Sequence, residues 1–313
     1  MITKPTVLVL GAGASIAYGF PSGNQLLETI HQELNPDSGR RLLGAKMIED
    51  CGISPSLIKQ FRWQLYYSQQ PSVDAFLEHR PEFLEVGKLT IALCLIPHED
   101  QDHLLRFQAR VEGCYQYLFA NMNGPFDTFQ NNQLSVITFN YDRSFEHYLF
   151  SALVHSYGKP QDQCAEKIGH IPIIHVHGSL GPLPWQSSVG RPYEATYGPD
   201  DLVEAAKQIK IVSEAQFPSP EFTAAHEILK KAQRIYFLGF GYHNVNLERL
   251  RLDQLPKPLL KELPSLRSDF HMTGTTLGLG ATQRMAITRK WHIELSAIQH
   301  DTLRFLRENA FLD

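Results

Sequence analysis

The sequence predicts an α/β fold: a Rossmann-like parallel sheet with helices on both faces and a large helical insertion. A five-residue apolar run, Thr6 to Leu10, leads directly into a glycine-rich turn, which is typical of a buried parallel strand. Similar short apolar runs return only after residue 130, and each is followed by polar or Gly-rich residues. Between them, residues 38–130 carry apolar side chains at helical spacing.

The composition fits a globular protein. The chain has 313 residues, 43% hydrophobic and 20% charged, which suits one large domain or a domain with a big insertion. Its net charge of −4 gives no overall basic field, so we do not expect direct nucleic-acid binding unless a local patch or a partner supplies it.

The sequence also bears on location and metals. It begins without the charged and apolar regions of a signal peptide, and no run approaches the roughly 18 apolar residues of a membrane span, so we expect a cytoplasmic protein without membrane contact. The four cysteines, at positions 51, 94, 114 and 164, are isolated from one another, as reduced core thiols are. They form no Cys-x-x-Cys zinc motif, and we expect no metal.

The first turn, Gly11-Ala-Gly-Ala-Ser15, is typical of a phosphate-binding turn. Gly11 and Gly13 lack a Cβ, so their N–H groups can approach a pyrophosphate at the start of a helix that begins near Ile16. The dinucleotide fingerprint requires a third glycine where Ile16 stands, which disfavours an ordinary dehydrogenase. A glycine turn that closes a βα unit without a ligand is the alternative.

The helical insertion divides the chain into two predicted parts. Residues 1–37 and 131–313 form the sheet domain, and residues 38–130 form a helical module. This module could form an oligomer interface, a surface on which a partner docks, or a second, smaller hydrophobic core, and the sequence does not decide among the three. Helices are predicted at 24–34 in the sheet domain and at 57–67, 73–77, 83–95 and 104–122 in the module.

The remaining strands are expected to end at one crevice, because ligands of open parallel sheets lie outside the carboxyl ends of the strands. A proline-rich stretch, 181–200, is a long loop that can act as a lid. The strands are predicted at 134–138, 171–176, 234–238 and 269–273, and the helices at 141–151, 202–211, 221–232 and 298–308.

Polar residues follow the second and third of these strands. Thr138-Phe-Asn140-Tyr-Asp142 delivers an amide that can hold a ribose hydroxyl or a water, and a carboxylate that can orient a neighbour. Alternatively, Asp142 caps the next helix and Asn140 satisfies a turn. After the third strand, His175 and His177 are two residues apart and are expected to face the same side.

His177, next to Gly178, is placed to act as a base toward a ligand. A metal-binding His-x-His pair and two core histidines with backbone partners are the alternatives. The fourth strand is followed by Gly239-Phe-Gly241, which is expected to line the ribose or phosphate side of the pocket or to form a tight turn. Residues 274–280 are expected near the adenine end.

These pieces, in this order, resemble the sirtuin family. Gly11-Ala12-Gly13-Ala14-Ser15 with Gly19 and Pro21 is similar to its cofactor loop, and Thr138-Phe-Asn140-Tyr-Asp142 is similar to its Thr-x-Asn-x-Asp element. His177-Gly178-Ser179 is similar to the catalytic His-Gly, and Gly239-Phe-Gly241 to the Gly-rich turn after the next strand.

The resemblance implies that the protein uses NAD as its substrate and cleaves the nicotinamide–ribose bond. Asn140 would then position the ribose and the attacking water, Asp142 would support the nicotinamide pocket, and His177 would act as the base. The resemblance implies a cofactor-binding set of Gly11, Ala12, Gly13, Ser15, Gly19, Pro21, Thr138, Gly239 and Gly241.

Two departures from the family indicate which activity remains. No cysteine follows Cys164, so the four-cysteine zinc ribbon of protein-deacylating sirtuins is missing. Ser22-Gly23 follow Pro21 where family members often place Phe-Arg. The chain thus resembles the zinc-less sirtuin-like effectors of bacterial anti-phage defence, which hydrolyse NAD and cause abortive infection.

That resemblance implies an NAD+ glycohydrolase that is active as a homo-oligomer or with a partner that senses infection, such as an ATPase or nucleotide-processing subunit. A module that senses NAD or ADP-ribose without cleaving it is the alternative, and an NAD-dependent protein deacylase is a weaker one.

Overall fold

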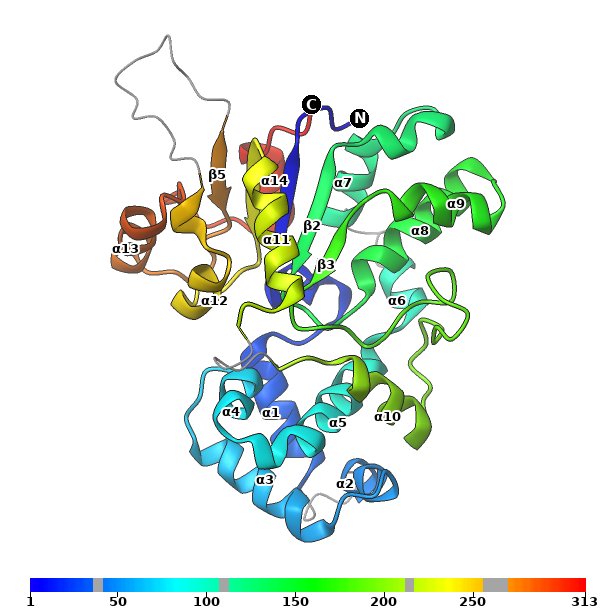
Figure 1. Cartoon of the computed structure of the whole chain (residues 1–313), viewed down its shortest axis with the longest axis vertical. Coiled ribbons are helices and arrows are strands. Elements are labelled where there is room, and N and C mark those ends of the chain that lie inside the picture. The colour runs from blue at the N-terminus through cyan, green and yellow to red at the C-terminus, as the bar shows by residue number, and fades with distance from the viewer. Residues whose placement is uncertain (36–41, 107–112, 212–216, 256–269) are drawn as a thin grey trace.

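A computed structural model describes residues 1–35, 42–106, 113–211, 217–255 and 270–313. Its centre is one five-stranded sheet in which every pair of neighbouring strands is parallel (Figure 1). The strand order is β3-β2-β1-β4-β5, with β1 in the middle. The strands are β1 (Thr6–Leu10), β2 (Leu134–Thr138), β3 (Ile173–His175), β4 (Arg234–Leu238) and β5 (His271–Gly274).

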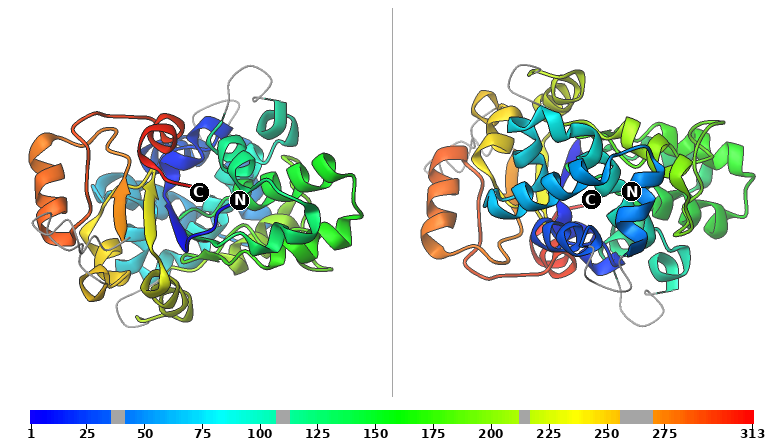
Figure 2. Two further views of the ribbon diagram at one scale, coloured as in Figure 1. Left: turned by 90° about the horizontal axis from the view of Figure 1, so that it is seen from above. Right: turned by 90° about the horizontal axis from the view of Figure 1, so that it is seen from below.

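Helices cover both faces of this sheet, so the predicted fold class is confirmed (Figure 2). Alternate residues of β1 explain the two layers: Leu8 belongs to one buried apolar cluster, and Val7 and Val9 belong to the other. The first face is covered by α7 (Cys114–Met122), α8 (Ser144–Tyr157) and α14 (Thr302–Asn309), and the second by α11 (Pro220–Lys231), α12 (Asn244–Arg249) and α13 (Ala281–Trp291).

A helical lobe lies beyond the carboxyl ends of the strands (Figure 1). Its centre is α5, which is buried along most of its length and is packed by α1 and α10 as well as by its sequence neighbours. The lobe therefore contains helices from both predicted domains. Helix α7, which was predicted as part of the helical module, packs instead on α8 and α14. The lobe contains α1 (Gly23–Glu33), α2 (Leu42–Asp50), α3 (Pro55–Tyr67), α4 (Val73–His79), α5 (Leu84–Leu95) and α10 (Pro199–Gln208).

Serine caps start three of these helices. Ser22 forms a capping box with Gln25 at the start of α1, and Ser54 and Ser72 accept from the backbone at the starts of α3 and α4. Ser22 and Gly23 thus start a helix at the position where sirtuins, the family that the sequence resembles, often have Phe-Arg. The sequence patterns predicted none of α2, α9 (Gln161–Gly169), α12 and α13 as separate helices.

The prediction of one helix over 104–122 is wrong. The chain forms α6 (Gln101–Arg106) and, after extended Gly113, a separate α7; residues 107–112 lie outside the described part. A Cβ on Gly113 would lie 2.6 Å from the Tyr18 hydroxyl, and that hydroxyl accepts from the Tyr115 N–H. Close packing against Tyr18 therefore overrides the apolar periodicity.

The helix expected to begin near Ile16 is also different. Two short 3-10 turns, Ala12–Ala14 and Ile16–Tyr18, follow β1, and left-handed Gly19 ends the second with φ of 90°. Ile16, Ala17 and Gly19 are exposed, which leaves this loop accessible to a ligand. None of the helices in the described ranges is both long enough and apolar enough to cross a membrane.

Candidate functional site

The glycine turn after β1 packs directly on the turn after β4. Gly11 N–H donates to the Leu238 carbonyl at 3.0 Å, and Gly13 N–H donates to the Gly239 carbonyl at 2.9 Å. A Cβ on either glycine would lie under 3 Å from the backbone of Gly239. Both N–H groups are thus used inside the protein, which corrects the expectation that they face a pyrophosphate. The missing Cβ atoms instead let β1 and β4 end side by side.

Ser15, Asn140 and Asp142 form one hydrogen-bonded network at the ends of β1 and β2. Asn140 Nδ2 donates to the Gly11 carbonyl at 3.0 Å and to Ser15 Oγ at 3.1 Å, and Ser15 Oγ donates to Asp142 Oδ2 at 2.9 Å. Thr138 Oγ1 accepts from the Asn140 N–H at 3.0 Å. The structure therefore brings these predicted residues together.

The amide of Asn140 has a fixed orientation in this network. The Gly11 carbonyl can only accept, so the nitrogen of the amide must face it. The two Nδ2 hydrogens are then used on Gly11 and Ser15, which leaves Oδ1 as the remaining hydrogen-bonding atom of the half-buried side chain. Asn140 is thus set to accept from a ligand hydroxyl or a water.

Asp142 has both roles that the sequence left open. Its Oδ1 accepts from the Ser144 N–H at 3.1 Å, at the start of α8, and its Oδ2 holds Ser15. Burial raises the pKa of the carboxyl, and the hydrogen bonds from Ser144 and Ser15 lower it in part. Asp142 therefore fixes both Ser15 and the helix that begins beside it.

His177 lies in an aromatic cage next to this network. Its ring contacts those of Phe139, Tyr141 and Phe222, at centroid distances of 5.6, 6.4 and 5.9 Å. His177 is 5% exposed, and its Nδ1 has no hydrogen-bond partner among the described residues. Burial lowers its pKa, so the ring is neutral near pH 7 and Nδ1 can accept a proton.

Asn140 and His177 are neighbours through the backbone. Phe139 and Tyr141, on either side of Asn140, both contact the His177 ring, although no hydrogen bond in the described chain joins Asn140 to His177. We call Ser15, Asn140, Asp142 and His177 the junction site.

His175 and His177 do not share a side, which corrects the prediction. Strand β3 ends at His175. The Gly178 N–H then donates to the His175 carbonyl and closes a turn, so the His177 side chain no longer follows the alternation of the strand. The His175 ring lies between Glu146 and the Asn140 carbonyl, at 2.9 Å from each. Within the described ranges, no group of three or more His, Cys, Asp and Glu is placed to hold a metal ion.

Charged residues of the helical lobe reach the same place, and no sequence pattern indicated them. On α4, Asp74 accepts a hydrogen bond from the Tyr141 hydroxyl, and Glu78 forms a two-bond ion pair with Arg249 of α12 at 2.9 and 3.0 Å. Asp74 and Glu78 raise the pKa of His177, while Arg249 lowers it. Helix α4 thus places two carboxylates near His177 on the lobe side.

The other predicted cofactor-binding residues are spread around the glycine turns. Ala12 and Pro21 are half-buried, and Gly19 lies near the His103 ring. Gly241 follows the turn in which Gly239 N–H donates to Thr275 Oγ1 at 2.9 Å. That bond joins the start of residues 274–280 to the same edge of the sheet.

The predicted lid is tied to the residue that precedes α8. The buried guanidinium of Arg143 donates to the carbonyls of Pro182, Arg191 and Pro192 at 2.9 to 3.1 Å. Glu99 pairs with Arg143 at 2.5 Å, and both side chains are fully buried. The stretch is therefore held at several points rather than poised to swing.

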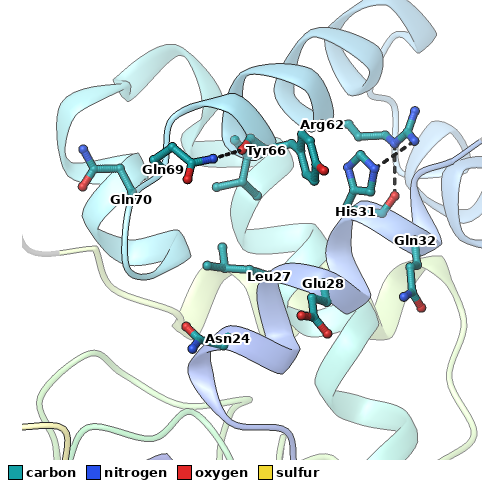
Figure 3. Close-up of a pocket in the computed structure, with 10 residues that line it drawn as sticks. Asn24, Leu27, Glu28, His31, Gln32, Arg62, Tyr66, Gln69 and Gln70 are labelled. Carbon is teal, nitrogen blue, oxygen red and sulfur yellow. Dashed lines mark hydrogen bonds between the residues drawn. The ribbon is translucent and has the colours of Figure 1, made fainter. Parts of the chain in front are cut away.

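A separate groove of about 490 Å³ lies between α1 and α3 in the helical lobe (Figure 3). The Tyr66 ring stacks on His31 at 4.3 Å, and Arg62 donates to the His31 carbonyl. The remaining lining is mainly polar, with Asn24, Glu28, Gln32, Gln69 and Gln70. This groove contains no residue of the junction site.

No protein-family model matches this chain, and no curated protein sequence matches it. The chemistry of the junction site therefore has to be argued from its own residues.

Proposed function

We propose that this protein is an NAD+ glycohydrolase, which converts NAD+ and water to nicotinamide, ADP-ribose and a proton. The observation that carries the proposal is the junction site: an oriented Asn140 amide and a neutral His177 at neighbouring strand ends, beside an accessible loop after β1. In an open parallel sheet this edge is where a nucleotide binds.

The reaction needs a water placed on the ribose carbon as nicotinamide leaves. The oxygen of that water forms a bond to the carbon while the carbon–nitrogen bond breaks and its electrons go to nicotinamide. Asn140 Oδ1 accepts from the water or a ribose hydroxyl, and His177 Nδ1 takes the proton that the water loses. Ser15 and Asp142 hold Asn140 in place.

The biological role follows from the sirtuin resemblance of the motifs at these positions. Because no cysteine follows Cys164, a zinc-dependent peptide module is not part of the proposal. We place the chain among zinc-less sirtuin-like effectors that deplete NAD during bacterial anti-phage defence, as a homo-oligomer or with a partner that triggers it.

The test is to incubate purified protein with NAD and to quantify nicotinamide and ADP-ribose, alone and in extract from phage-infected cells as a source of the trigger. Asn140→Ala and His177→Ala should lower turnover by about 100-fold or more. His170→Ala, on an exposed histidine, is the matched control and should leave turnover unchanged. Undiminished turnover in both site variants would refute the assignment.

The burial of His177 favours a second candidate, a module that binds NAD or ADP-ribose without cleaving it. A base that is 5% exposed reaches a substrate only when the residues around it move. Calorimetric binding of NAD without nicotinamide release, in every assembly state, would support this alternative.

A further inference from the structure

His175 is a half-buried polar residue that the proposed reaction does not use directly. Its ring Nδ1 lies 2.9 Å from the Asn140 carbonyl oxygen, and its Nε2 lies 2.9 Å from Glu146 Oε1 on α8. Both ring nitrogens thus face oxygen atoms. His175 therefore links the backbone of Asn140, a residue of the junction site, to the carboxyl group of Glu146.

The number of protons in this arrangement is fixed by its partners. The Asn140 carbonyl can only accept, so Nδ1 must carry a hydrogen. A neutral imidazole has one N–H, which would leave Nε2 bare against a carboxylate oxygen. The contact at Nε2 therefore needs one more proton, so the ring is an imidazolium paired with an ionised Glu146, or Glu146 is itself protonated.

The surrounding charges favour the imidazolium. Burial alone would lower the pKa of His175, but the charge of Glu146 and the hydrogen bonds to Glu146 and Asn140 raise it above its usual value. Asp142 raises it further. On the adjacent strand β2, the residue in register is the uncharged Thr138.

Helix α11, which also packs against β3, adds little charge at this point. Its Glu221 pairs with Lys210, its Lys230 pairs with Glu227, and its Lys231 is exposed. His226, the remaining titratable group of α11, contacts the Leu250 carbonyl through Nδ1. The protonation state of His175 is thus set mainly by Glu146.

We propose that His175 is a positioning residue whose protonated ring, held by Glu146, fixes the Asn140 carbonyl and thereby keeps the Asn140 amide on Gly11 and Ser15. This inference rests on the proposed NAD hydrolysis for its kinetic consequence. At high pH the His175 ring loses its Nε2 proton and can no longer donate to Glu146, so the ring is held less firmly. NAD turnover should therefore fall as His175 deprotonates.

Two isosteric variants separate the two contacts of the ring. His175→Asn places an amide nitrogen near the Nδ1 position and keeps the contact with Asn140, whereas His175→Gln places one near Nε2 and keeps the contact with Glu146. We expect His175→Gln to lower kcat by about 100-fold with little change in KM, because Asn140 is misplaced. His175→Asn, combined with Glu146→Gln, should retain most turnover and lose the decline at high pH.

Nitrogen-15 NMR of the wild-type chain tests the same point without activity or folding of a variant. We expect His175 to keep the shifts of an imidazolium to a higher pH than a free histidine does, and the side-chain amide signals of Asn140 to move with the titration of His175. A His175 that titrates at or below the usual histidine pKa, or equal kinetics of the two variants in an active protein, would overturn the inference. Wild-type protein that never cleaves NAD, yet shows this coupled titration, would instead refute only the proposed function.

Discussion

The Ser15 hydroxyl donates to Asp142 Oδ2 at 2.9 Å and accepts from Asn140 Nδ2 at 3.1 Å, and so links two strand ends that are 125 or more residues apart in sequence. Removing this hydroxyl leaves a buried carboxylate oxygen and an amide hydrogen without their partner. Ser15→Ala should destabilise the fold by about 1–3 kcal/mol and lower NAD turnover by about 10-fold or more. Denaturant unfolding and product release measure the two effects, and Ser188→Ala, at an exposed serine, should change neither.

Gly239 should tolerate no side chain. Its φ is 58°, and a Cβ there would lie 2.1 Å from the Ala14 nitrogen. Gly239→Ala should cost at least about 3 kcal/mol, because backbone strain adds to overpacking. Gly158 has the same φ, but a Cβ there meets nothing within 4 Å, so Gly158→Ala should cost only about 1 kcal/mol. Equal losses in the free energy of unfolding would contradict this account.

The buried pair of Glu99 and Arg143 should be the main anchor of residues 181–197. Glu99→Gln leaves the guanidinium without its countercharge and should cost about 3–5 kcal/mol. Chymotrypsin should then cut faster after Trp185 or Tyr193. The surface pair of Arg80 and Glu82 offers the control, since Glu82→Gln should leave the free energy of unfolding nearly unchanged.

His147 should make the protein less stable in acid. Burial and the Arg143 charge lower the pKa of its ring to about 4. The unfolded chain binds this proton near pH 6.5 and the folded chain only near pH 4, so stability from this group is complete above pH 6.5 and declines as pH falls through that window. His147→Phe, which can keep the stack on Tyr193, should flatten the decline by about 3 kcal/mol. An unchanged pH dependence of unfolding would refute the assignment.

The turnover profile should rise with pH on its acidic side. Burial lowers the pKa of His177, so the ring becomes protonated, and unable to act as a base, only below its usual range. We expect the acidic limb to lie below the usual pKa of histidine. Glu78→Gln removes a charge that raises this pKa and should shift the acidic limb to lower pH, as a pH series of initial rates measures.

The sheet could be predicted because β1, β2 and β4 are short, mainly apolar runs whose bounds coincide with the patterns. The Ser15, Asn140 and Asp142 grouping followed from the rule that ligand sites lie at strand ends. The contribution of α4 could not be predicted, since Asp74 and Glu78 lie on an ordinary amphipathic helix and meet Tyr141 and Arg249 only in the folded protein.

Other differences come from packing that a local pattern does not encode. The re-aimed His177 depends on the turn after β3, and the break at Gly113 depends on Tyr18, almost a hundred residues earlier. Helix α13 buries only Trp291 among its described residues, so it has no apolar stripe to detect.

The helical lobe shares one apolar cluster with the sheet, from Leu8 and Leu10 of β1 to Phe61 of α3 and Ile91 of α5. Excising residues 42–95 would therefore remove the helix on which α1 and α10 pack, together with Asp74, the partner of the Tyr141 hydroxyl. We expect shortened versions to precipitate rather than to fold as a smaller protein, and an exchange of this segment between proteins would have to include α10.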